Sequence, residues 1–200
     1  MNIYKQILKN NISRLVTLYN LDNFSATYGY GDRLFWGWKA SDFVNGTFQG
    51  GVHSLSIAVK MGLLENEKFV LNVIDSVIRA IDKIRLKNGS MEEAFPNESS
   101  FCVTALVAFD VLSAIDLLSN KISKIKKDDY LKIIAPLIKF ISTNEEKHAI
   151  ISNHLSTALA AILLWNRLAN DNNQKFKRIL EIIYRNQSQE GWFKEYEGAD

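Results

Sequence analysis

Apolar residues recur at the 3.6-residue spacing of α-helices along most of this chain. In segment 2–20 the spacing is clear, because the apolar residues from Ile3 to Tyr19 share one helical face. The pattern predicts an all-α fold in a single domain, 1–200. The expected helices are 2–20, 49–64, 66–86, 99–118, 128–142, 151–168 and 171–187.

Segment 128–142 contains a helix breaker and needs a cap. We expect Asp128 or Asp129 to be its N-cap, because a carboxylate can accept hydrogen bonds from the free N–H groups of a first turn. Pro136 should kink the helix or divide it, because proline has no N–H to bond to the carbonyl four residues earlier.

Three of the predicted helices share a sequence pattern. SSFCVTALVAFDVL, from residue 99, and SNHLSTALAAILLW, from residue 152, align without gaps, and GGVHSLSIAVKMGLL, from residue 50, is a looser copy. Each is nearly uniformly apolar, whereas a partner such as KFKRILEIIYRN, from residue 175, is amphipathic. A repeat of about 50 residues with one helix of each kind is a helical hairpin unit. We expect parallel inner helices at 49–64, 99–118 and 151–168, and antiparallel outer helices at 66–86, 128–142 and 171–187.

The turn before an inner helix is repeated as well. NGSMEEAF, 88–95, and EGWFKEYE, 190–197, share Gly-x-(Met/Phe)-x-Glu, with their glycines roughly 100 residues, or two periods, apart. Together with the alternating helices, this pattern resembles the α/α toroid over residues 30–200. The resemblance implies a barrel of inner helices within a sleeve of outer ones. A complete toroid has more than the seven helices predicted here, so we expect an incomplete ring that self-associates through its open edge or is completed by further sequence.

Within the toroids, SNHL at the start of an inner helix, followed by EGWFKEYEGAD, is similar to heparinase II/III-type polysaccharide lyases and alginate lyases. This resemblance implies that Asn153 binds a uronate carboxylate, that His154 neutralises it or acts as a base, and that Tyr196 takes part in catalysis. The turns also resemble the glutamine–tryptophan repeats of squalene cyclases and protein prenyltransferases. Such an enzyme needs an acidic or zinc motif, and Asp128–Asp129 stands alone.

An anion at the start of helix 151–168 also has a physical basis. Free backbone N–H groups and the helix dipole favour negative charge at a helix N-terminus. The alternative is structural: Ser152 or Asn153 caps the helix, and His154 is a satisfied histidine of its first turn.

Further substrate-binding residues are expected around the same end of the barrel. The segment 21–49 has no helical periodicity but many aromatic residues, which can stack on sugar rings, so we expect it to be ordered and to lie over this end, with Trp36 or Trp38 near a histidine. His53 holds a similar place to His154 two repeats earlier. The expected set is Tyr30, Asp32, Arg33, Trp36, Trp38, His53, Glu93 and Trp192. The alternatives are a strap that fills the barrel end, repeat-derived packing for His53, and solvated carboxylates for Glu93.

Composition narrows the function classes. With 24 basic and 22 acidic residues the chain has no electrostatic footprint for nucleic acid. One cysteine excludes an internal disulfide, and with three histidines it leaves little for zinc, so no metal or cofactor is expected. No apolar run is long enough for a membrane span, and the amino end is no signal peptide, which predicts a cytoplasmic location.

We therefore expect a carbohydrate-active protein whose partner is an acidic, uronate-containing polysaccharide or oligosaccharide, cleaved by lyase-type β-elimination. A glycoside hydrolase is an alternative, because Glu92, Glu93 and Glu98 supply the carboxylates that such enzymes need. A terpene-cyclase-like or prenyltransferase-like toroid is another. The third is a non-catalytic helical-repeat scaffold that binds partners on a concave face.

Overall fold

The computed structural model describes residues 2–196. In this range the chain is all-α, as predicted, with two isolated β-bridges. The elements are α1 (Ile3–Val16), α2 (Arg33–Trp36), the 3-10 helix η1 (Gly46–Gly51), α3 (Val52–Lys60), α4 (Glu67–Ile84), α5 (Phe101–Leu117), α6 (Lys124–Thr143), α7 (Ser152–Ala169) and α8 (Lys175–Arg185). No helix in the described range has both the length and the apolar character needed to cross a membrane.

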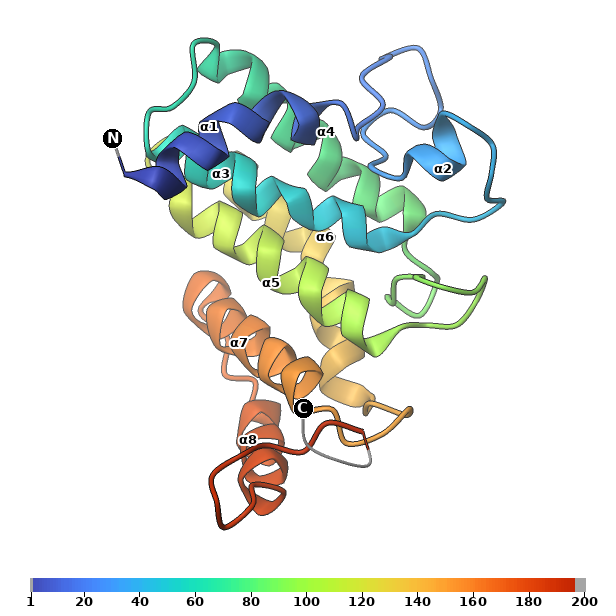
Figure 1. Ribbon diagram of the computed structural model, residues 1–200, viewed down its shortest axis with the longest axis vertical. Helices are drawn as coiled ribbons and strands as arrows, with labels where there is room; N and C mark the ends of the chain where they lie inside the picture. Colours follow the sequence, from blue (N-terminus) through green and yellow to red (C-terminus); the bar gives the residue numbers. More distant parts are fainter. Residues whose placement is uncertain (1, 197–200) are drawn as a thin grey trace.

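The long helices form two layers (Figure 1). In one layer α5 packs between α3 and α7, and in the other α4 packs against α6. Two contacts show that α5 and α7 run parallel: His154 meets Cys102 near the start of both helices, and Arg167 meets Asp116 at 2.9 Å near their ends. This is the predicted grouping of α3, α5 and α7. Closure of the helices into a ring stays a prediction.

Burial determines the position of each helix in these layers. Helix α5 is apolar on all sides and buries ten of its residues, including Val107, Val111 and Leu112. Helix α4 is amphipathic, buries Val73, Ile74 and Val77, and packs against α3 and α6. A helix without a polar stripe must be surrounded, whereas an amphipathic helix can face water on one side. Because α5 is apolar on all sides, it lies at the centre of the molecule.

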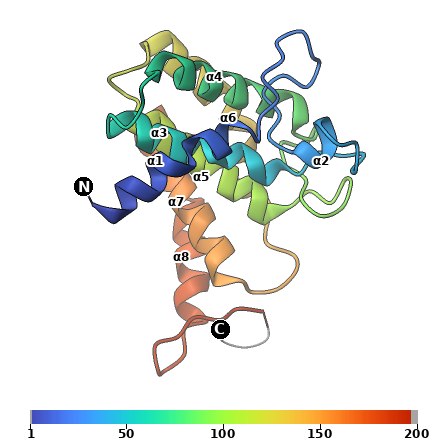
Figure 2. The ribbon, with the colours of Figure 1, turned by 45° about the horizontal axis from the view of Figure 1, so that its top comes forward.

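Helix α7 departs from the expectation of an entirely buried helix. Leu155, Ala158 and Ile162 are buried, but Leu163 is 45% exposed. Helices α5 and α8 cover two of its sides, and both views place α7 and α8 at one end of the molecule (Figures 1 and 2). Helix α6 also contacts α7, and the exposed residues of α7 are Asn153, Ser156, Leu163 and Arg167, so its solvent side is of mixed polarity.

The N-cap expected for α6 is wrong, and so is a division of the helix at Pro136. The helix begins at Lys124, and its N-cap is Ser123, whose hydroxyl accepts a hydrogen bond from the Lys126 N–H at 3.2 Å, so neither Asp128 nor Asp129 caps it. Pro136 lies inside a single helix and does not divide it. Ile134 and Leu137, on either side of Pro136, are fully buried, and this packing holds the two halves together despite the missing hydrogen bond.

The repeated turn has the same geometry in both copies. The Leu86 N–H donates to the Ser90 carbonyl and the Gly89 N–H to the Leu86 carbonyl, at 2.8 and 2.9 Å. The corresponding bonds join Ser188 with Trp192 and Gly191 with Ser188, at 2.9 and 3.1 Å. Gly89 and Gly191 have φ angles of 91° and 98°, a conformation that favours glycine.

Each turn also binds the start of a helix in the first layer. The Gly46 N–H, at the start of η1, donates to the Glu92 carbonyl at 2.8 Å. The Ser152 N–H, at the start of α7, donates to the Lys194 carbonyl at 3.1 Å. The sequence repeat therefore marks a structural unit that joins a turn to a helix N-terminus.

Gln49 anchors the aromatic segment 21–49. Its buried side chain accepts a hydrogen bond from the Gly31 N–H at 2.8 Å and donates to the carbonyls of Gly29 and Val77 at 3.1 and 2.8 Å. The first part of the segment thus rests on α4, and η1 at its end reaches the turn before α5. Gln49 could not be predicted as an anchor, because an amide in an irregular segment has no periodicity to identify it.

Replacing Gln49 by Ala should lower the free energy of unfolding by about 1–3 kcal/mol, because buried backbone groups lose their partners. Urea unfolding of the two proteins measures this difference. Gln189→Ala, at an exposed position, is the matched control and should stay close to wild type. Equal stability of Gln49→Ala and wild type would contradict an anchoring role.

Candidate functional site

The N-terminus of α7 is capped by a distant segment. The N-cap residue Ile151 has no side-chain acceptor, and it forms a β-bridge with Glu195. The Glu195 carboxylate accepts a hydrogen bond from the Asn153 N–H at 2.8 Å. Capping by Ser152 or Asn153, the structural alternative considered for this helix, is therefore wrong, because the bridge fixes the N-cap one residue earlier.

The three residues expected to be catalytic lie at this helix end. Asn153 and His154 belong to the first turn of α7, and the Asn153 side chain is exposed to solvent. Tyr196 directly follows Glu195 and is 56% exposed. The bridge between Ile151 and Glu195 thus brings residues more than 40 positions apart to one place.

Glu146 is the acidic partner of His154. Its side chain is only 3% exposed, and Oε2 lies 2.7 Å from His154 Nδ1. Oε1 lies 2.9 Å from His148 Nδ1 and accepts hydrogen bonds from the N–H groups of Lys147 and His148. Burial raises the pKa of Glu146, but the hydrogen bonds from His154 and His148 outweigh it and lower the pKa to about 2.

His154 is held in its charged form. The hydrogen bond with the Cys102 thiol and the hydrogen bond with Glu146 raise the pKa of the imidazole to about 10, against the opposing effect of burial. At neutral pH the ring is therefore an imidazolium that donates to Glu146. Such a group can neutralise an anion, but it cannot accept a proton, so it favours the neutralising role over the basic one.

His53 lies in a separate cluster. Its Nδ1 lies 3.0 Å from Asp110 Oδ1, and the Phe109 ring meets it edge-on at 5.9 Å. Because Asp110 is in the middle of α5 and Cys102 near its start, the two histidines sit at levels about 12 Å apart along this helix. The expectation that His53 and His154 hold equivalent places at one mouth is therefore wrong: η1 precedes α3 and moves His53 along α5.

Gly50 and Tyr19 lie beside the pair formed by Asp110 and His53. A Cβ atom at Gly50 would overlap the Asp110 carboxylate, so only glycine allows η1 to approach so closely. The buried Tyr19 hydroxyl donates to the Phe48 carbonyl at 2.9 Å. Burial, and then the charge of Asp110, raise the pKa of Tyr19. Gly50 and Tyr19 therefore lie beside the Asp110 carboxylate that pairs with His53.

The charged residues of the aromatic segment hold that segment together. Asp32 is buried, and its two oxygens accept hydrogen bonds from the N–H groups of Leu34 and Asn45, both at 2.9 Å. The Arg33 guanidinium lies over the rings of Trp36 and Trp38, at 5.5 and 5.3 Å. Asp32 is therefore the N-cap of α2 and lies out of solvent.

The aromatic rings of this segment differ in exposure. Trp36 donates to the Leu18 carbonyl at 3.0 Å, whereas Trp38 is 64% exposed and could stack on a ligand. The Tyr30 ring stacks on Phe35 at 6.1 Å, and burial raises the pKa of its hydroxyl. The described contacts of the two tryptophans join them to Leu18 and Arg33.

Glu93 and Trp192 occupy the two copies of the turn and lie in different surroundings. Glu93 accepts a hydrogen bond from the hydroxyl of Ser100, the N-cap of α5, at 3.3 Å. Trp192 is 42% exposed and donates to Glu190 at 3.2 Å. Of the two, only Trp192 belongs to the turn that meets α7.

Comparison with known proteins adds no relatives: no family model, curated protein or solved structure matches this chain. The site is therefore defined by its own geometry. Sequence reasoning proposed Asn153, His154 and Tyr196 as site residues, and it did not predict Glu146 and Cys102, the partners of His154. The only available signal was the acidic pair 145–146 shortly before an inner helix.

The pairing of His154 with Glu146 should make stability depend on alkaline pH. The folded-state pKa of His154, about 10, lies above the ordinary value of 6.5, so the stabilisation is complete below pH 6.5 and is lost as pH rises toward 10. In wild type this loss should amount to about 1.5–3 kcal/mol, as for hydrogen bonds between charged groups. His154→Gln should not show this loss when the free energy of unfolding is measured with urea at pH 6.5 and at pH 10.

His148→Gln is the matched control, because His148 contacts the same Glu146 carboxylate and is 70% exposed. The control should keep the wild-type dependence on pH. If His154→Gln and wild type lost the same stability between the two pH values, His154 would not be held as an imidazolium by Glu146.

Proposed function

We propose that this chain is carbohydrate-active and that the N-terminus of α7 binds the carboxylate of an acidic, uronate-containing glycan for lyase-type β-elimination. The observation that carries the proposal is a buried carboxylate, Glu146, that keeps His154 positively charged beside the exposed amide of Asn153. A strongly shifted histidine in a partly open place is typical of functional sites.

Three side chains carry out the steps of β-elimination at a uronate. The His154 imidazolium neutralises the substrate carboxylate, which acidifies the neighbouring C–H, and the Asn153 amide donates to the same carboxylate. Tyr196 is the base that takes the proton from carbon. The electron pair forms the new double bond, the glycosidic C–O bond breaks, and the Tyr196 phenol returns the proton to the departing oxygen.

We also propose that the two layers are part of an α/α toroid. The parallel α3, α5 and α7, and the turns that join neighbouring helix starts through Glu92 and Lys194, support this arrangement. In a toroid the α7 N-terminus would face the mouth of the barrel, where a polysaccharide can enter.

The activity is tested by incubating the protein with a panel of uronate-containing glycans and following the absorbance of the unsaturated uronate. Asn153→Ala, His154→Gln and Tyr196→Phe should each reduce the rate about 10²–10⁴-fold. Tyr184→Phe, on the exposed face of α8, is the matched control and should keep the wild-type rate. Circular dichroism checks that each variant is folded.

Other outcomes of this assay would contradict the proposal. New reducing ends without a double bond would indicate a glycoside hydrolase. Turnover of a prenyl diphosphate would indicate a cyclase or prenyltransferase. Glycan binding without turnover of any substrate would indicate a binding scaffold.

Self-association through the α7–α8 end stays a prediction. Leu163, Tyr184 and Trp192 are 45%, 62% and 42% exposed there, and exposed apolar side chains of this size favour association. Sedimentation should show dimers or larger species, and Leu163→Glu should shift the population toward monomer. A wild-type monomer over a wide range of concentrations would exclude this edge as an interface.

A further inference from the structure

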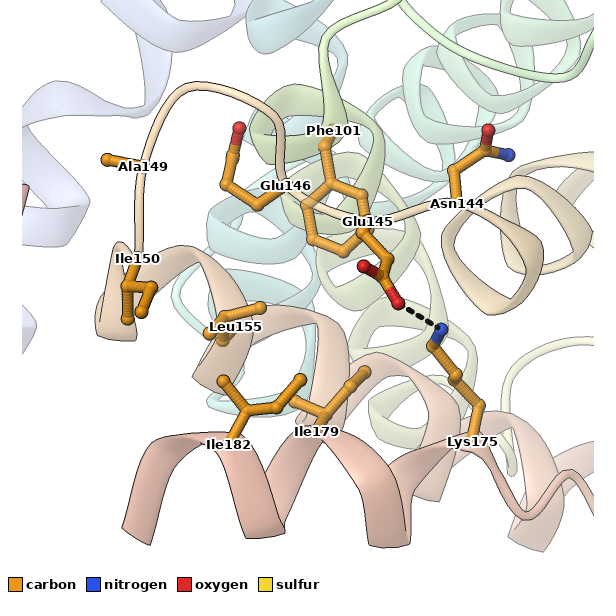
Figure 3. A pocket seen from close by; sticks show the side chains of 10 residues that line it. All are labelled: Phe101, Asn144, Glu145, Glu146, Ala149, Ile150, Leu155, Lys175, Ile179 and Ile182. Atoms are coloured by element: carbon orange, nitrogen blue, oxygen red, sulfur yellow. Dashed lines mark ion pairs between the residues drawn. The ribbon is translucent and has the colours of Figure 1, made fainter. Parts of the chain in front are cut away.

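A cavity of about 230 Å³ lies beneath the segment that joins α6 to α7 (Figure 3). Its wall comes from α5, α7, α8 and this segment, and most of the lining side chains are apolar. They are Phe101, Ala149, Ile150, Leu155, Ile179 and Ile182. A cavity with apolar walls and a few polar groups is the usual form of a small-molecule site.

One ammonium group faces this cavity. The side chain of Lys175 is 16% exposed, and its Nζ lies 3.8 Å from Glu145 Oε1, beyond hydrogen-bond distance. Figure 3 shows Lys175 and Glu145 directed toward each other beside the apolar side chains. An ammonium so little exposed and so loosely paired is suited to a ligand that can accept its hydrogen bonds.

The balance of charge around the cavity favours an anion. Glu145 contacts the Arg178 guanidinium in addition to Lys175. Glu146 is paired with the His154 imidazolium on its other side. Each carboxylate therefore has a cation of its own, and Lys175 remains as the surplus positive charge at the cavity.

We propose that this cavity binds a small amphipathic monocarboxylate, with its apolar body among Leu155, Ile179 and Ile182 and its carboxylate on Lys175. The size is suitable, because a cavity of about 150 Å³ accommodates benzene, so the larger volume here accommodates a ring and a short acidic arm. A ligand without an acceptor would leave the Lys175 ammonium unpaired, and a protonated amine would be repelled by its positive charge. The cavity adjoins the glycan site through Glu146, and the proposal does not rest on the proposed function.

Calorimetric titration of the whole chain with phenylacetate tests this site. Phenylethanol has a similar apolar body without the charge, and it should bind about tenfold more weakly or worse. Lys175→Met should remove the preference for the acid while keeping the weak binding of the alcohol. Lys177→Met, at an exposed position on the same helix, is the matched control and should bind like wild type.

Ile182→Trp, which fills the cavity, should abolish binding of both compounds, with its fold checked by circular dichroism. Equal affinity for the acid and the alcohol, or phenylacetate binding unchanged in Lys175→Met, would overturn the proposal. Absence of phenylacetate binding at millimolar concentration would also overturn it. Because none of these measurements uses glycan turnover, their outcome is independent of the lyase assay.

Discussion

The burial of α5 is the constraint on which the rest of the structure depends. Its residues are apolar in every direction, so the chain is stable only when other elements surround this helix. Helices α3 and α7 cover its flanks, and α6 covers its outer side. The start of α5 places Cys102, and its middle places Asp110, so one packing requirement positions both polar clusters.

The layers could be predicted because local patterns determine them. The uniformly apolar stretch at 99–112 and the amphipathic stretch at 175–186 differ in how much surface they can leave in water, and this difference decides which helix is central. Contacts outside the regular helices have no comparable pattern in the sequence. The start of α6 was misplaced because Ser123 caps it ahead of a lysine-rich first turn, and Pro136 is tolerated because Ile134 and Leu137 are buried beside it.

The site was partly predictable for a similar reason. Asn153 and His154 are adjacent in the sequence and open a helix, and the repeated turn contains Tyr196. The charge of His154, however, depends on Glu146 from an irregular segment and on Cys102 from another helix. Neither partner stands at a helical spacing from His154, so only the tertiary fold brings them together. Asp110 beside His53 is hidden from the sequence for the same reason.

The cap on α7 has a consequence for the order in which the molecule forms. Ser152 and Asn153 obtain their hydrogen-bond acceptors from Lys194 and Glu195, which are synthesised after the whole of α8. A nascent chain that has just completed α7 therefore holds a helix with open N–H groups and an unfinished site. The site is complete only when α8 has packed against α7 and the turn after α8 has bonded to the start of α7. Brief detachment of that turn in the finished protein would return the helix end to the nascent state without disturbing α5.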